Sequence, residues 1–289
     1  MAKELPLNPL WQSLGASFKE VMAWRIPMVF KGVESECDTV RTKAGLIDYS
    51  YFGKIQLSGK DSVQFLHNIL TNDIKKLNPG EGCPAALLTA PGKVLSYMKV
   101  YRETAGLLLE VEMNQEEKTA QLLNKYVIME DVEIKTVTHD ISQLSLQGPL
   151  SGSLLNALFP AVSLPQKSFN HIQIYFEGAE IMLINQSSSK EMRFDLLIPN
   201  TAAEALAKKI LSYGKKLGVE PAGYESAETL RIAAGILRYG LDFNENTFLP
   251  ETDLDILCVS ETKGCYPGQE AVARYRTYKR PIQPRFLLL

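Results

Sequence analysis

The sequence has few of the residues on which several common kinds of site depend. It contains only three histidines, His67, His139 and His171, and four cysteines, of which the nearest pair is separated by six residues. A structural metal site needs cysteines or histidines in close pairs, and a Ser-His-Asp triad needs a histidine near a serine and an acid. We therefore expect no metal site, no serine hydrolase chemistry and reduced cysteines.

Long apolar runs and an excess of one charge are also lacking. The longest apolar stretches, SLLNALF and AEIMLI, are far shorter than the roughly 20 residues that span a membrane. The 31 Lys and Arg against 33 Asp and Glu leave a net charge of -2, so no basic bias indicates nucleic acid. The segment MAKELPLNPLWQ lacks the apolar centre of a signal peptide. We expect a cytoplasmic protein that binds neither membrane nor nucleic acid.

Nucleotide-binding signatures are missing as well. No G-x-G-x-x-G pattern follows a predicted strand, and no P-loop is present. What the chain does contain is 45% hydrophobic and 22% charged residues, which is typical of a soluble globular protein. Its 289 residues lie near the upper limit for a single hydrophobic core, so we expect two or more lobes.

Hydrophobic periodicity predicts alternating helices and antiparallel strands. Three strands, CPAALLT, KVLSYMKVYR and GLLLEVE, are separated by turn sequences and predict a meander. The run IQIYFEGAEIMLINQ predicts a hairpin. Helical spacing of apolar residues predicts helices over 13–24, 60–73, 114–128, 201–218 and 224–237. Together these elements indicate an α+β protein with antiparallel sheets.

Three blocks of the sequence carry a pattern shared with known proteins. They are AGLIDYSYFGKIQLSGKDSVQFLHNILTNDI, GCPAALLTAPGKVLSYMKVYR, and LRIAAGILRYGLDFNENTFLPETDL leading into KGCYPGQEAVAR. The blocks together resemble the folate-binding family that contains the glycine-cleavage aminomethyltransferase and the YgfZ proteins of iron–sulfur cluster metabolism. The first two blocks are common to both branches, whereas K-G-C-Y-x-G-Q-E resembles the YgfZ signature.

The resemblance implies a fold and a domain organisation. The fold would be aminomethyltransferase-like, with antiparallel sheets flanked by helices in two lobes. Residues 1–274 would form the folate-binding body, with two interleaved lobes, the second over approximately 52–140. Family members continue into a C-terminal β-barrel, whereas 275–289 suffice for about one strand. We therefore expect 275–289 to be the remnant of a truncated or missing barrel.

The resemblance also implies a cofactor, tetrahydrofolate or a derivative, and, for the YgfZ branch, iron–sulfur client or assembly proteins as partners. In the aminomethyltransferases an aspartate of a G-x-I-x-D-D-L segment assists transfer of the one-carbon unit, and the aligned residues here are Ser96 and Tyr97. Neither carries a carboxylate, so transfer chemistry loses its main charged group. The leading hypothesis is a tetrahydrofolate-binding protein that supports iron–sulfur cluster assembly or repair. An aminomethyl transferase of one-carbon metabolism and a non-catalytic folate-binding scaffold are the alternatives.

Candidate folate contacts also follow from the resemblance. Glu191 aligns with a folate-binding glutamate, and an ionised carboxylate accepts two parallel hydrogen bonds. The alternative is a solvated surface glutamate. The other candidates are aromatic residues that would stack on a pterin, an asparagine that would bond its edge and an arginine that would reach the glutamate tail: Phe52, Tyr97, Tyr101, Asn114 and Arg231. Core packing, helix capping and a structural ion pair are the respective competing explanations.

The segment ETKGCYPGQEAVARY contains the candidate functional thiol, Cys265. Nearby positive charge or a helix N-terminus favours a thiolate, and Lys263 lies two residues earlier while QEAVARY predicts a helix just after. The flanking glycines suit a tight turn, which Gln269 and Glu270 would hold through backbone N–H groups. The residues expected to support the thiol are Lys263, Gly264, Tyr266, Gly268, Gln269, Glu270 and Arg274.

The alternative for any cysteine is that it is small, buried and inert. For Cys265 the charged, glycine-rich flanks leave both explanations open. Cys37, Cys83 and Cys258 lie in or beside apolar segments without such flanks, so we expect these three to be inert.

Overall fold

The computed structural model describes residues 2–188 and 191–278, and it divides the chain into two compact units. Unit 1 consists of Met1–Phe52 and Thr138–Ile236, and unit 2 of Gly53–Val137 with the chain from Leu237 onward. Each unit is therefore built from two separate stretches. The sequence placed only residues of approximately 52–140 in the second lobe, whereas the structure adds the C-terminal segment to it.

Unit 1 is built around a six-stranded sheet with the order β11-β12-β13-β10-β4-β14, antiparallel throughout except where β14 pairs with β4. Its strands are β4 (Gly45–Asp48), β10 (Ile141–Gln147), β11 (His171–Phe176), β12 (Ala179–Asn185), β13 (Arg193–Pro199) and β14 (Glu220–Pro221). A second sheet has three strands, β1 (Lys3–Glu4), β2 (Ser17–Val21) and β3 (Trp24–Val29). The helices are α1 (Asn8–Ser13), α2 (Val33–Thr42), α5 (Ser151–Leu158), α6 (Asn200–Gly214) and α7 (Tyr224–Ala234).

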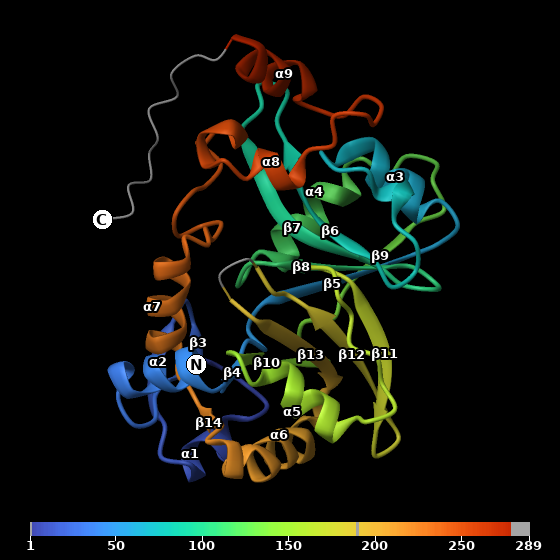
Figure 1. Ribbon diagram of the computed structural model, residues 1–289. Coiled ribbons are helices and arrows are strands. Elements are labelled where there is room, and N and C mark those ends of the chain that lie inside the picture. The colour runs from blue at the N-terminus through green and yellow to red at the C-terminus, as the bar shows by residue number, and fades with distance from the viewer. Residues whose placement is uncertain (1, 189–190, 279–289) are drawn as a thin grey trace. The chain divides into compact units, whose positions relative to one another are not determined.

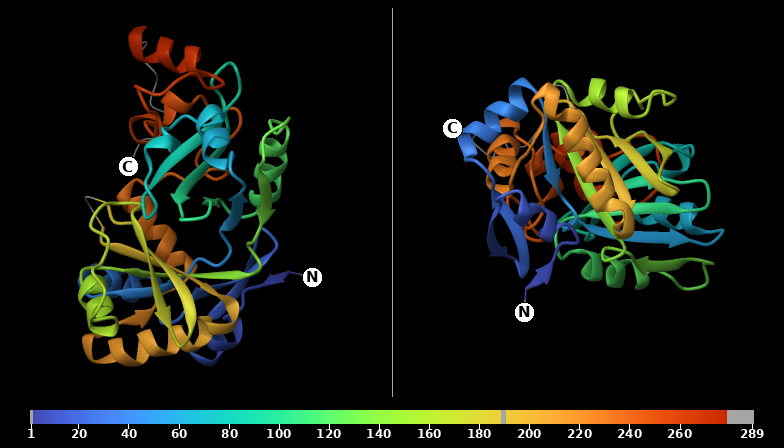
Figure 2. Two further views of the ribbon diagram at one scale, coloured as in Figure 1. Left: turned by 90° about the vertical axis from the view of Figure 1, so that its right-hand side faces the viewer. Right: turned by 90° about the horizontal axis from the view of Figure 1, so that it is seen from below.

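Strand alternation divides the six-stranded sheet into an apolar and a polar face. Phe194, Leu196 and Ile198 of β13 belong to the hydrophobic core, together with Leu154 of α5 and Leu206 of α6. Figure 1 shows α5 and α6 beside this sheet, and the right view of Figure 2 shows α6 lying across its strands. Arg193 and Asp195 occupy alternate positions of β13 and point to the opposite face, because side chains alternate along a strand.

Unit 2 contains a five-stranded antiparallel sheet with the order β6-β7-β8-β5-β9. Its strands are β5 (Gly53–Ser58), β6 (Gly82–Leu88), β7 (Val94–Arg102), β8 (Leu107–Val111) and β9 (Glu133–Thr136). Its helices are α3 (Ser62–Ile69), α4 (Glu116–Asn124), α8 (Asp255–Cys258) and α9 (Gln269–Tyr278). Short 3-10 turns lie at Ile74–Lys76 and Leu249–Thr252, and a third, Lys215–Leu217, follows α6 in unit 1.

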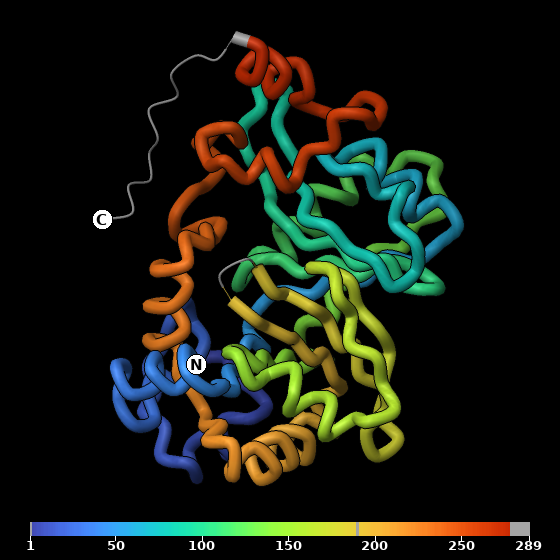
Figure 3. Tube along the Cα trace, in the orientation of Figure 1, coloured from blue at the N-terminus to red at the C-terminus, as the bar shows by residue number. Residues whose placement is uncertain are grey.

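Two hydrophobic clusters stabilise unit 2. In the first, Phe65 and Leu66 of α3 and Leu123 of α4 pack on the sheet. The second holds the C-terminal segment, because Tyr266 and Val272 pack with strand residues of β6 and β7. The chain trace in Figure 3 shows this segment, in red, passing beside α3. The loop that carries Cys265 is therefore attached to the core of unit 2.

The α+β class, with antiparallel sheets flanked by helices, is confirmed. The β6–β7–β8 meander, the β11–β12 hairpin and helix α6 lie where the periodicity predicted them. The helix predicted over 13–24 is wrong, because β2 and β3 form a hairpin there. Met22 and Ala23 have φ of 48° and 65°, the left-handed pair that joins two strands tightly.

The end of the chain differs from the single strand expected over 275–289. Residues 275–278 complete helix α9, and 279–289 lie outside the described residues. Up to Tyr278, no strand follows β14 in the described chain. In the same described part, no helix is both long enough and apolar enough to cross a membrane.

Candidate functional site

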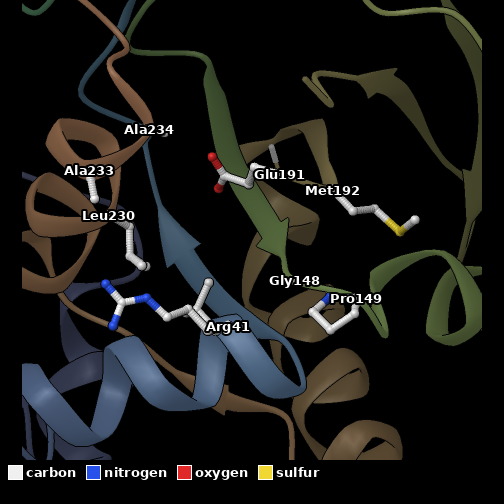
Figure 4. Close-up of a pocket in the computed structure, with 9 residues that line it drawn as sticks. Arg41, Gly148, Pro149, Glu191, Met192, Leu230, Ala233 and Ala234 are labelled. Carbon is white, nitrogen blue, oxygen red and sulfur yellow. The ribbon is translucent and has the colours of Figure 1, made fainter. Parts of the chain in front are cut away.

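Unit 1 contains a cavity of about 460 Å³, drawn in Figure 4. Residues of α2 and α7 line it together with two loop segments, 148–149 and 191–192. Small-molecule sites usually measure about 300–1,000 Å³, so the volume suits a small ligand. Among the described residues, the walls are largely apolar and carry two charged side chains, Glu191 and Arg41.

Glu191 precedes β13 and reaches into this cavity with its carboxylate towards the α7 side (Figure 4). It is half-buried rather than solvent-exposed. Burial raises the pKa of Glu191, the Arg193 guanidinium opposes this rise, and the Asp195 carboxylate adds to it. A carboxylate removed from water gains more from the N–H donors of a ligand than an exposed one does.

A buried polar network begins two residues after Glu191, at Arg193, and its charges act on the Glu191 carboxylate. Arg193 donates from Nε and Nη2 to the two carboxylate oxygens of Asp195, at 2.9 and 2.8 Å. Asp195 is completely buried and also accepts hydrogen bonds from Ser145 Oγ at 2.6 Å and Gln143 Nε2 at 3.0 Å. The Arg193 guanidinium lies 4.6 Å from the centre of the Tyr49 ring. This network fixes the start of β13 and thereby the backbone next to Glu191.

Phe52 lies in an aromatic cluster near this network. Its ring centre is 5.1 Å from that of Tyr49 and 5.0 Å from that of Tyr51. Gln147 Nε2 donates to the Tyr49 hydroxyl at 3.2 Å, and burial raises the pKa of Tyr49, a rise to which the nearby Glu191 charge adds. Phe52 is thus half-buried and packs against Tyr49, the tyrosine whose pKa the Glu191 charge helps to raise.

Arg231 lies on α7, one residue after the cavity residue Leu230, but its side chain stays at its own helix. Its Nε donates to Glu228 Oε2 at 3.0 Å, and its Nη1 donates to the carbonyl of Ile236 at 2.5 Å. Arg231 therefore closes the C-terminal end of α7 and forms the structural ion pair that was the alternative for it. In the part of the chain that the structure describes, the cation that lines the cavity is Arg41 of α2.

In unit 2, Ser96 and Tyr97 point to opposite faces of β7. Ser96 is buried, and its hydroxyl shares a 2.8 Å hydrogen bond with that of Thr119. Tyr97 packs edge-on against Phe243 with 6.0 Å between the ring centres, and burial raises its pKa. Ser96 thus presents a hydroxyl that is already hydrogen-bonded in the core, and Tyr97 presents a neutral phenol.

Tyr101 and Asn114 also belong to unit 2. Tyr101 is completely buried, and its hydroxyl donates to Glu110 Oε2 at 3.3 Å, while Lys99 Nζ pairs with Glu110 Oε1 at 2.6 Å. Asn114 has φ of 58°, a left-handed conformation that asparagine tolerates better than most residues. The N-cap of α4 is the next residue, Gln115.

Cys265 is exposed and lies in the loop between α8 and α9, residues 259–268, which we call the thiol loop. This loop is attached to the C-terminal end of α3. Lys263, predicted as a nearby positive charge, is buried, and its Nζ donates to the carbonyls of His67 and Leu70. Burial lowers the pKa of Lys263 to about 8, against the opposing effects of Asp73 and Cys265. Carbonyls at a helix C-terminus attract cations, so Lys263 fastens the loop to α3.

The second attachment of the loop is Gly268, whose φ is +83°. A Cβ there would lie 2.6 Å from the carbonyl oxygen of Thr89, so the turn requires glycine. At Gly264, by contrast, a Cβ would meet nothing within 4 Å, and that glycine is not required by the fold. Tyr266 is buried between these points, with Lys263 Nζ 4.9 Å from its ring centre, and burial raises its pKa to about 12.

The predicted helix after Cys265 is α9 (Gln269–Tyr278). Gln269 closes the turn with its backbone N–H, which donates to the Tyr266 carbonyl at 3.2 Å. Glu270 was expected to bond the loop backbone, but it is exposed and pairs with Arg274 one turn later on the helix. Arg274, the other member of this pair, is likewise exposed.

The four cysteines are all free thiols, in very different surroundings. Cys37 and Cys258 are buried and Cys83 is half-buried, whereas Cys265 is exposed. Burial raises the pKa of Cys37 and Cys258, and raises that of Cys83 to about 12. These three thiols remain protonated at neutral pH, as expected of inert cysteines.

Sequence reasoning missed Arg41, Tyr49, Arg193 and Asp195. A signal existed for the last two, because two opposite charges at alternate positions of the apolar strand RFDLLIP share one face of a sheet. No local signal marked Arg41, which looks like any cation of a surface helix. Its importance comes from the cavity, which joins α2 to α7 across most of the length of the sequence.

Residues 7–262 of the chain match the family described as GCVT N-terminal domain. The aminomethyltransferase of Caldanaerobacter subterraneus subsp. tengcongensis is 32% identical over 278 residues, which cover 95% of this chain and 74% of that protein. The aminomethyltransferase of Anoxybacillus flavithermus is 30% identical over 285 residues, covering 97% and 78%. The crystal structure of glycine cleavage system aminomethyltransferase T from Bartonella henselae has the same fold, with a TM-score of 0.86 at 23% identity, covering 96% of this chain and 76% of that one.

Proposed function

Because the chain belongs to the GCVT N-terminal domain family, we propose that it binds a reduced folate, tetrahydrofolate or a derivative, in the cavity of unit 1. The observation that carries this proposal is the half-buried carboxylate of Glu191 in a largely apolar cavity of about 460 Å³. An ionised carboxylate accepts two parallel hydrogen bonds, as the amino group and ring N–H of a pterin would donate. The apolar walls suit the flat, uncharged rings of the ligand.

The finer role that we propose is YgfZ-like: a cytoplasmic accessory factor in the assembly or repair of iron–sulfur clusters, with Cys265 as the functional thiol. Two features support it. The K-G-C-Y-x-G-Q-E segment resembles the YgfZ signature, and Cys265 is the exposed cysteine among four. A thiol on an exposed loop is accessible to a partner protein, whereas a buried one is not.

Aminomethyl transfer to or from tetrahydrofolate is the second candidate function, and the names of the relatives favour it. Against it, Ser96 and Tyr97 place no carboxylate where the family resemblance requires an acid. An assay with glycine-cleavage components tests this candidate. Turnover that depends on the chain would establish the transferase, and turnover equal to the blank would leave the accessory role.

Folate binding is tested by calorimetric titration of the full chain with tetrahydrofolate. We expect saturable one-to-one binding, weakened at least tenfold by Glu191→Gln because the amide has one acceptor oxygen where the carboxylate has two. Glu180→Gln is the matched control, since Glu180 is an exposed glutamate on β12 of the same unit. A wild-type protein that does not bind folate, or equal affinities for wild type and Glu191→Gln, would contradict the proposal.

The role of the thiol is tested in cells that depend on the protein for the activity of iron–sulfur enzymes. We expect Cys265→Ala to lose this support, whereas Cys83→Ala, which removes a half-buried thiol of the same unit, retains it. Comparable protein levels in the two strains exclude a folding defect. Full activity of the cluster enzymes with Cys265→Ala would reject the thiol role and leave a folate-binding scaffold.

A further inference from the structure

We infer that Arg41 binds the carboxylate-bearing tail of the folate, so that the cavity of unit 1 holds its ligand between an acid and a base. This inference rests on the proposed folate binding and adds a residue that determines ligand specificity. Arg41 lies on α2, and Glu191 lies on the segment leading into β13. Figure 4 shows the two side chains entering the cavity from these different elements.

Among the described arginines near the cavity, Arg41 has the weakest ion pair within the protein. It approaches Asp38 at 3.9 Å, the outer limit of an ion pair, and the two side chains are 54% and 69% exposed. Exposed pairs of this kind contribute little because water screens them. The planar guanidinium of Arg41 therefore keeps its fork of N–H donors for the bidentate binding of a carboxylate.

Two other arginines of the described residues near the cavity already form ion pairs. Arg193 makes a two-bonded pair with the buried Asp195 and is 13% exposed. Arg231 is 12% exposed and is held by Glu228 and by the Ile236 carbonyl. Binding a ligand carboxylate through either of these arginines would break a partly buried ion pair. Binding it through Arg41 would replace a weak, exposed ion pair.

The wall that joins the two charges is made of α7. Leu230, Ala233 and Ala234 face the cavity, and two of these three side chains are single methyl groups. Small residues leave room for a flat ring against the helix, as the aminobenzoyl group of a folate requires. An acid that recognises N–H donors and a base that recognises a carboxylate then permit one orientation of the ligand.

The test compares two ligands that differ only in the tail. Tetrahydrofolate carries the glutamate, and tetrahydropteroate ends at the aminobenzoate and lacks it. Arg41→Gln keeps a good helix-forming residue at an exposed position, so the variant is expected to fold. Lys208→Gln is the matched control, because Lys208 is an exposed cation of unit 1 that pairs within its own helix.

We expect Arg41→Gln to weaken tetrahydrofolate binding about tenfold, to the affinity of the wild type for tetrahydropteroate, and to leave the binding of tetrahydropteroate within twofold. Lys208→Gln should bind both ligands like the wild type. Equal loss for both ligands, or no loss for tetrahydrofolate, would overturn the assignment of Arg41 while folate binding stands. A wild type that binds neither ligand would overturn the proposed function itself and this inference with it.

Discussion

The cavity of unit 1 and the thiol loop of unit 2 place their reactive groups in opposite ways. Glu191 is half-buried in a wall of apolar residues, and burial raises its pKa. Cys265 is exposed, while the residues that hold its loop, Lys263 and Gly268, are buried. In the cavity the carboxylate itself is partly buried. In the loop the thiol is exposed and the residues that hold the loop are buried.

The difference indicates which kind of partner suits each site. A desolvated carboxylate in a cavity discriminates among small molecules. A ligand that leaves this charge without a hydrogen bond binds weakly, and a ligand with a matching N–H donor binds more tightly. The Cys265 thiol, by contrast, lies on an exposed loop and is not among the described residues that line the cavity of unit 1. It is available to the surface of another protein, and this contrast underlies the assignment of separate roles to the two sites.

The largest expected effect concerns the attachment of the loop at Gly268. Gly268→Ala should lower the free energy of unfolding by about 2–4 kcal/mol, since it adds a strained left-handed alanine and a clash with the Thr89 carbonyl. Gly264→Ala, in the same loop, should change it by less than about 0.5 kcal/mol because its Cβ meets open space. Urea unfolding measures both, and equal effects would show that the loop is not attached at Gly268.

The next expected effect is smaller and concerns Lys263, which holds the loop at the end of α3. Lys263→Met removes the donor to the carbonyls of His67 and Leu70 and should cost about 1–3 kcal/mol. Faster amide exchange of residues 261–266 should accompany the loss. Lys75→Met, which removes an exposed cation of the same unit, is the control. Unchanged exchange in Lys263→Met would mean that the lysine does not hold the loop.

Replacing Glu191 should change ligand affinity strongly and the free energy of unfolding weakly. The change in the free energy of unfolding should depend on pH. Burial raises the pKa of Glu191 in the folded state above its ordinary value of 4.5, so between these two pKa values the folded state binds more protons than the unfolded state. The contribution of Glu191 to stability is therefore present at acid pH and is lost as the pH rises through the folded pKa. Glu191→Gln should be slightly more stable than the wild type at pH 7 and equal to it near pH 4.

Thermal unfolding of both proteins across this pH range measures the difference. A variant that is less stable than the wild type at pH 7 would contradict the burial of the charge. Folate binding by the wild type should weaken as the pH falls through the same window, because protonation removes an acceptor from the carboxylate.

The smallest expected effect on the isolated protein is that of Cys265→Ala. The side chain is exposed, so unfolding free energy should change by less than about 0.5 kcal/mol and folate affinity by less than twofold. Cys258→Ala, which empties a buried position, should cost about 1 kcal/mol or more in the same urea titration. A folate affinity that depended on Cys265 would remove the separation between the two sites.

Sequence periodicity predicted the elements in which a single face is apolar over a sufficient length. Helix α6 and the β6–β7–β8 meander are of this kind. It failed at 13–24, where the spacing of apolar residues is compatible with a helix and the turn at Met22 and Ala23 contains no glycine to mark it. The hairpin was selected there by contacts of β3 with residues outside 13–24, because β3 also pairs with β1 and its side chains Trp24 and Ile26 are buried in the core.

The candidate site was predictable only in part for the same reason. Family resemblance indicated Glu191 and Cys265, and local spacing indicated that Lys263 is close to the thiol. Spacing could not show that Lys263 is buried on the end of α3, or that Arg41 faces a cavity shared with α7. Both facts depend on segments that are far apart in the sequence.

The most direct test of the account is a crystal structure of the full chain with tetrahydrofolate. The account predicts the pterin amino group and ring N–H within hydrogen-bonding distance of the Glu191 carboxylate, the rings against α7, and no ligand contact with Cys265. A folate bound without contact to Glu191, or one bound against Cys265, would contradict the separation of a folate cavity in unit 1 from a thiol loop in unit 2.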